Sequence, residues 1–88
     1  MKINVEGIAP RFKDRIIEIV EGIDTLKCIY LPKENTMPTT LVFEAEGEDL
    51  DDSIDIMKGA IKKSDIGRII NFRVIPSGEL YYFRKAKK

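Results

Sequence analysis

The sequence predicts an α+β domain in which an open four-stranded antiparallel sheet carries two helices on one face. Two stretches with apolar residues at helical spacing are interleaved with four β-prone stretches. A chain of 88 residues has room for one hydrophobic core. It contains no apolar run long enough to cross a bilayer, so we expect a globular domain that does not enter the membrane.

The first half of the chain predicts one strand and one helix. Residues 1–6 alternate between apolar and polar side chains, which is typical of a half-buried strand. Pro10 suits the first turn of a helix, and Gly22 suits its end. The apolar face between them consists of Phe12, Ile16, Ile17, Ile19, Val20 and Ile23.

The middle of the chain predicts a hairpin. Residues 25–31 and 39–46 are rich in β-prone side chains, and the polar segment 32–38 connects them. In the second of these strands, alternate residues would face the helices, and the others would lie on the open side. We expect the first set to be Leu41, Phe43 and Ala45, and the second to be Thr40, Val42 and Glu44.

The last part predicts a second helix and a further strand. The helix opens around Asp49 and ends near residues 64–67, with Leu50, Ile54, Met57 and Ile61 on its apolar face. Residues 68–75 are predicted as strand four, and a turn at 76–79 would allow a short fifth strand at 80–83. The domain would then span residues 1–83, with residues 84–88 as a basic C-terminal tail.

Two β–α units joined by a hairpin predict the ferredoxin-like βαββαβ arrangement. We expect strands one and three to lie side by side and parallel in the centre of the sheet. Both helix N-termini would then emerge at the same edge. The basic start of helix one would lie near the acidic start of helix two, and the two would either neutralise each other or mark a site.

The composition excludes several kinds of chemistry. With no His and one Cys, the chain cannot assemble the usual nitrogen and thiolate ligands of zinc, copper or iron–sulfur clusters. No imidazole is present to activate a Ser or Cys nucleophile, and the glycine-rich phosphate-binding motifs are missing. We therefore expect neither an enzyme nor a bound cofactor.

Charge and cysteine usage bear on partners and compartment. Fifteen basic and fifteen acidic residues give a net charge of zero, so any nucleic acid or anionic membrane would have to bind a local patch. The lone Cys28 and an N-terminus unlike a signal peptide lead us to expect the cytoplasm. The lack of His, Trp and Gln alongside abundant Ile, Lys and Glu is similar to proteins of thermophiles.

The start of helix one is a candidate ligand site. Arg11 and Lys13 place two cations where the helix dipole favours anions. Together with Gly7 and Pro10 they could hold a small anionic ligand at the free backbone N–H groups. The alternative is surface charge without a ligand.

The start of helix two is acidic. Its carboxylates, Glu48, Asp49, Asp51 and Asp52, could bind a hard cation such as calcium. Their spacing does not match an EF-hand loop, and an Asp cap followed by acids is ordinary helix capping. We therefore expect no metal and keep calcium as the alternative.

Two surfaces are candidates for larger partners. The open sheet face mixes apolar and charged residues, which suits a homodimer contact, and it lacks the exposed aromatics of RNA-binding sheets. Residues 81–88 mix aromatic and basic side chains that could contact single-stranded nucleic acid. The alternative is that these aromatics complete the core and the lysines are solvated.

The stretch from Ile3 to Leu31, a strand, Gly7-Ile8-Ala9-Pro10, a helix, Gly22-Ile23 and a strand, resembles the opening of ACT-type modules. These are small ferredoxin-like domains that pair up and bind amino acids. Arg11 stands where such modules carry a glycine, and the downstream half has no specific match. The resemblance implies the fold and the pairing, so the leading hypothesis is a non-enzymatic, self-associating module with a small anionic ligand.

Overall fold

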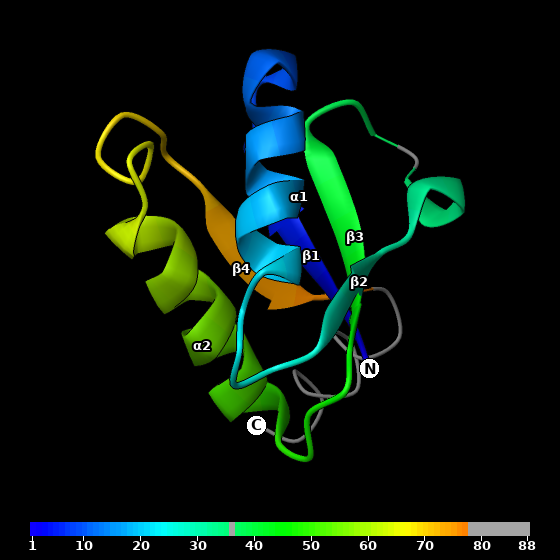
Figure 1. The fold of residues 1–88 in the computed structure, drawn as a ribbon. Coiled ribbons are helices and arrows are strands. Elements are labelled where there is room, and N and C mark those ends of the chain that lie inside the picture. The colour runs from blue at the N-terminus through cyan, green and yellow to red at the C-terminus, as the bar shows by residue number, and fades with distance from the viewer. Residues whose placement is uncertain (36, 78–88) are drawn as a thin grey trace, which may run out of the picture.

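A computed structural model describes residues 1–35 and 37–77. Four strands, two α-helices and two short 3-10 turns follow one another along this part of the chain (Figure 1). In chain order they are β1 (Lys2–Glu6), η1 (Pro10–Phe12), α1 (Lys13–Glu21), β2 (Cys28–Tyr30), η2 (Pro32–Glu34), β3 (Thr40–Ala45), α2 (Leu50–Lys63) and β4 (Arg73–Pro76).

The four strands form one antiparallel sheet in the order β2-β3-β1-β4. Both helices pack on the same face of this sheet, and no described helix covers its other face (Figure 1). The predicted α+β class with an open sheet and two helices is confirmed. Within the described residues, neither helix is long and apolar enough to cross a membrane.

The core lies between the sheet and the helices. Alternate residues of β1 and β3 face the helices, as the alternation predicts, and Phe43 is fully buried. From the helices, the most deeply buried apolar side chains are Ile16, Val20, Met57 and Ile61. Val42 was predicted on the open side and is nevertheless only 5% exposed.

Strands β1 and β3 are adjacent but antiparallel, so the predicted parallel pairing is wrong. Lys2 lies opposite Glu44, and Glu6 lies opposite Thr40. The physical reason is that α1 returns the chain so that β2 runs in the direction of β1, and the hairpin then reverses it for β3. The predicted shared edge is also wrong, because α1 begins at one end of the sheet and α2 at the other (Figure 1). The basic and acidic helix starts do not neutralise each other.

Strand β2 is shorter than predicted. It covers Cys28–Tyr30 instead of residues 25–31, since the 3-10 turn at Pro32–Glu34 follows almost at once. The backbone N–H of Tyr30, on the edge strand, donates a hydrogen bond to Oε2 of Glu21 at 2.9 Å. A side chain from the end of α1 therefore occupies a donor on the edge of the sheet.

Strand β4 begins later than predicted, at Arg73 instead of residue 68. Residues 65–69 form consecutive turns, in which the N–H of Gly67 donates to the carbonyl of Ser64 at 3.2 Å. A Cβ on Gly67 would overlap the carbonyl oxygens of Ile61 and Lys62, so these turns fold back tightly on the end of α2. The predicted fifth strand at 80–83 and the tail at 84–88 lie outside the described residues.

Candidate functional site

The cations at the start of helix one lie against aromatic rings. The predicted helix begins with a separate 3-10 turn, Pro10–Phe12, and neither this turn nor α1 has a side-chain cap. The guanidinium carbon of Arg11 lies 4.8 Å from the centroid of the Phe12 ring, and Nζ of Lys13 lies 5.7 Å from the centroid of the Tyr30 ring. Each is a cation–π distance. The two side chains therefore use different rings and do not form one site.

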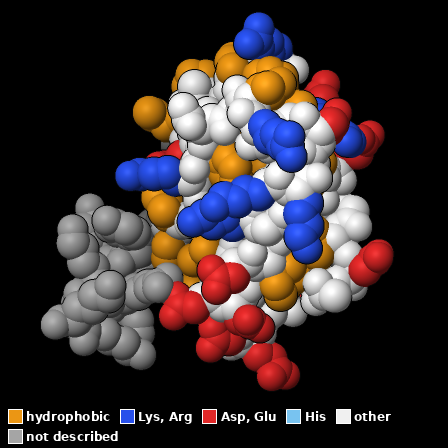
Figure 2. All heavy atoms as spheres, turned by 90° about the vertical axis from the view of Figure 1, so that its left-hand side faces the viewer, with side chains coloured by type: hydrophobic (Ala, Val, Ile, Leu, Met, Phe, Trp, Pro, Cys, Tyr) orange, Lys and Arg blue, Asp and Glu red, His pale blue; other side chains and the backbone are white. Residues whose placement is uncertain are grey.

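The acidic start of α2 is a helix cap. Oδ1 of Asp49 accepts the backbone N–H of Asp52 at 2.9 Å, and the Ser53 hydroxyl donates to the Asp49 carbonyl at 2.8 Å. Acidic side chains gather at the lower edge of the face seen in Figure 2, where α2 begins. Between residues 1 and 35 and between 37 and 77, no group of three or more His, Cys, Asp or Glu side chains could hold a metal ion. The calcium alternative at Glu48, Asp49, Asp51 and Asp52 thus gains no support.

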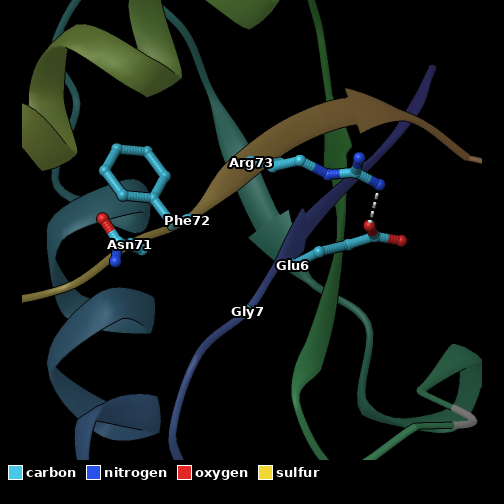
Figure 3. Close-up of a pocket in the computed structure, with 5 residues that line it drawn as sticks. All are labelled: Glu6, Gly7, Asn71, Phe72 and Arg73. Atoms are coloured by element: carbon cyan, nitrogen blue, oxygen red, sulfur yellow. Dashed lines mark hydrogen bonds and ion pairs between the residues drawn. The ribbon is translucent and has the colours of Figure 1, made fainter.

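A hollow of about 360 Å³ lies where β1 ends and β4 begins (Figure 3). It is lined by the last residue of β1 and the one after it, and by the first residue of β4 and the two before it. They are Glu6, Gly7, Asn71, Phe72 and Arg73. The hollow therefore joins segments that are far apart in the sequence.

Gly7 is required at this place by its backbone. Its φ of +82° lies in the left-handed region that favours glycine. A Cβ on Gly7 would lie 2.9 Å from the carbonyl oxygen of Asn71, closer than a real side chain approaches. The absence of a side chain thus lets the chain after β1 contact the segment before β4.

The polar part of the hollow contains one cation and one carboxylate. Glu6 and Arg73 are partners in the register of β1 and β4, and Nη2 of Arg73 donates to Oε1 of Glu6 at 2.8 Å. The Arg73 side chain is 72% exposed, so it can reorient toward a bound group. Asn71 and the half-buried Phe72 also line the hollow, and Figure 3 shows their side chains on the side of the helices, whereas those of Glu6 and Arg73 extend in the opposite direction.

The structure brings together only part of the predicted ligand site. Gly7 lines the hollow, whereas Pro10, Arg11 and Lys13 lie beyond it in η1 and α1. Sequence reasoning missed Asn71, Phe72 and Arg73 as partners of Gly7. The pairing of Glu6 with Arg73 depends on the strand register, for which opposite charge at the two positions is the only sequence signal.

Cys28 is a poor nucleophile in this fold. The residue is 4% exposed, and its burial, with a smaller effect of the nearby Glu21 charge, raises the pKa of the thiol to about 11. At neutral pH the thiol is protonated, and the thiolate is the reactive form. Cys28 therefore acts as a small apolar side chain of the core.

No protein-family model, curated protein or solved structure matches this chain. The resemblance of residues 3–31 to ACT-type modules therefore stays a prediction, and the function must be argued from the geometry.

Proposed function

We propose that the chain is a non-enzymatic binding module of the ferredoxin-like type, which self-associates through its open sheet face and takes a small anionic ligand in the hollow beside Gly7. The strand order β2-β3-β1-β4, with both helices on one face, is compatible with that arrangement. The cytoplasm is the compartment we propose, because Cys28 has no second cysteine to pair with.

The proposal of self-association rests on the open face. One row across it places Val42, Asn4 and Ile75 side by side, and Ile29 in β2 is 45% exposed on the same face. The apolar side chains of Val42, Ile75 and Ile29 suit contact with a second copy of the chain.

The edge of the sheet is a less suitable dimer contact. Pairing of two β2 strands would need the backbone N–H of Tyr30, which already donates to Glu21. Edge strands that are blocked by a charged side chain resist such pairing. The stacking of two open faces is therefore the contact we propose.

Light scattering over a range of protein concentrations tests the self-association. We expect the wild type to approach twice the mass of one chain, and Ile29→Glu to remain a monomer because it places a charge in the contact. Ile69→Glu is the matched control, since Ile69 is 67% exposed in the turn after α2, away from the open face. A monomeric wild type, or equal dissociation by both variants, would contradict the proposal.

The proposal of a ligand rests on Arg73 at the mouth of the hollow. Its guanidinium can form paired, charge-assisted hydrogen bonds with a carboxylate or phosphate. The volume of about 360 Å³ lies in the range of small-molecule sites. A bound anion would compete with Glu6 for Arg73, so we expect weak and salt-sensitive binding.

Titration with inorganic phosphate tests the ligand site, with the backbone amide shifts of Gly7 and residues 71–73 as the readout. We expect these amides to move in the wild type and in Arg11→Gln, and not in Arg73→Gln. The reverse pattern would place the anion at the helix start and overturn the proposal for the hollow. Unmoved wild-type amides with both phosphate and acetate would remove the ligand altogether.

A further inference from the structure

Four basic side chains gather around the C-terminal end of α2. Lys58 and Lys62 are one helical turn apart, Lys63 ends the helix, and Arg68 lies in the following turns. All four are exposed, and none forms an ion pair within the part of the chain that the structure describes. We call this set the basic surface. Figure 2 shows basic side chains over the middle and upper part of the face that α2 contributes to.

The turns after α2 bring the backbone before Arg68 close to the end of the helix. Gly67 contacts the carbonyl oxygens of Ile61 and Lys62, an approach that only a residue without a side chain allows. The N–H of Ile69 donates to the carbonyl of Ile66 at 3.1 Å, which closes the next turn. The basic surface is therefore built on ordered backbone.

Asp65 is the carboxylate between Lys58 and Arg68, and it is paired with Arg15. Nε and Nη2 of Arg15 in α1 both donate to Oδ1 of Asp65, at 3.1 and 2.8 Å. These hydrogen bonds are the main reason that the pKa of Asp65 is lowered, so it stays ionised and bound to Arg15. The four cations of the basic surface keep their charge for an external partner.

Apolar and aromatic groups lie directly beyond the basic surface along the chain. Ile69 is 67% exposed, and Phe72 and Asn71 line the hollow. Single-stranded nucleic acid offers phosphates to cations and unstacked bases to such groups. A duplex hides its bases, and an acidic peptide would leave the ring and the amide unused.

We propose that the basic surface binds single-stranded nucleic acid, with the phosphates on Lys58, Lys62, Lys63 and Arg68 and a base against Ile69 and Phe72. This function goes beyond the small-anion site and shares only Phe72 with it. The net charge of zero does not oppose it, because Asp51 and Asp52 lie in the first turn of α2, and Asp55 is the one acidic residue in the middle of the helix.

Fluorescence anisotropy of a labelled oligothymidine strand, measured with the full chain over a series of salt concentrations, tests this proposal. Each phosphate contact contributes about −0.7 to the slope of log affinity against log salt, so four contacts predict a slope of about −3. Lys58→Gln/Lys62→Gln should reduce the magnitude of the slope by about 1.4 and weaken binding at low salt on the order of tenfold. The phosphate titration of the hollow should not change in this variant, which separates this test from the previous one.

The matched control is Lys27→Gln/Lys33→Gln. It removes the same charge from two exposed lysines near β2, outside the basic surface. We expect it to keep the wild-type slope, and both double variants to keep the wild-type melting temperature. Equal weakening by the two double variants would show nonspecific attraction and overturn the proposal. Polyglutamate or phosphatidylserine vesicles that compete as well as unlabelled oligothymidine would also overturn it, in favour of an acidic protein or a membrane.

Discussion

The two places where a strand is followed by a helix both contain a glycine, for different reasons. After β1, Gly7 has a φ of +82° and contacts the backbone of Asn71. After β3, Gly47 has an ordinary φ, and a Cβ there would overlap Oγ of Ser53 and lie 3.1 Å from Cδ1 of Leu26. The first glycine serves backbone geometry, and the second leaves space for side chains.

The same two junctions differ in how the helix begins. Asp49 caps α2 and Ser53 bonds back to it, so this start is stabilised by residues within one turn. The start of α1 has no side-chain cap, and Gly7, at the beginning of this junction, lies against residues 71–72, far along the chain. The second junction is therefore a local structure, whereas the first depends on tertiary contacts.

Gly7→Ala tests the tertiary junction and should have the largest effect. The positive φ and the contact with the Asn71 carbonyl together should lower the free energy of unfolding by about 3 kcal/mol, measured by urea denaturation. Gly59→Ala is the control, because a Cβ at this position in α2 meets no atom within 4 Å. It should raise stability by up to about 1 kcal/mol. A Gly7→Ala protein as stable as the wild type would remove the distinction between the junctions.

Gly47→Ala tests whether the Ser53 side chain is what prevents a larger residue at the junction between β3 and α2. The added methyl group should cost about 2 kcal/mol, because Ser53 is 2% exposed and has little room to move. In the double variant Gly47→Ala/Ser53→Ala, the new methyl group no longer overlaps Oγ of Ser53. The double variant should therefore lose about 1 kcal/mol less than the sum of the two single variants in a double-mutant cycle. Strict additivity of the two changes would mean that Ser53 is not the obstacle.

Asp49→Ala removes the cap of α2. We expect a loss of about 1 kcal/mol in the free energy of unfolding, because the N–H of Asp52 loses its acceptor. Asp49→Asn is the control that keeps an oxygen acceptor, and it should lie within about 0.5 kcal/mol of the wild type. If both variants lose the same amount, the charge rather than the hydrogen bond stabilises this helix start.

Ala9→Asp would give the first junction the cap that it lacks. Ala9 has the extended conformation of a cap residue, with φ −63° and ψ 142°, and it precedes the turn that contains Arg11. We expect a gain of a few tenths of a kcal/mol to about 1 kcal/mol in thermal or urea unfolding. Ala9→Asn, the uncharged control, separates the contribution of the hydrogen bond from that of the charge. A loss of stability would show that the space around Ala9 excludes a larger side chain.

The accuracy of the sequence predictions follows the same division into local and tertiary structure. The start of α2 at Asp49 and its end near Ser64 were predicted correctly, since the cap and the apolar spacing are local patterns. Strand β4 was predicted too long, because residues 68 and 69 lie in turns that Gly67 anchors on α2, and residues 70–72 are irregular. Composition cannot show that backbone contact.

The direction of β3 could have been predicted correctly. The helix returns the chain so that β2 runs in the direction of β1, and the hairpin then reverses it once, so β3 must run antiparallel to β1. The hollow, in contrast, could not have been predicted from the sequence as a whole. Its residues come from the register of β1 with β4, and Phe72 and Asn71 lie outside the strand altogether. Only Gly7 could be identified from the sequence, because a glycine after a strand predicts an unusual turn.

The hydrogen bond from Tyr30 to Glu21 also bears on how the protein behaves when it is crowded. An unoccupied edge strand is a template on which further strands can add without limit, as in a fibril. Here an added strand would have to displace a carboxylate that holds the N–H at 2.9 Å. A solution that is concentrated enough to favour paired molecules should therefore still hold discrete particles, instead of filaments that lengthen with time.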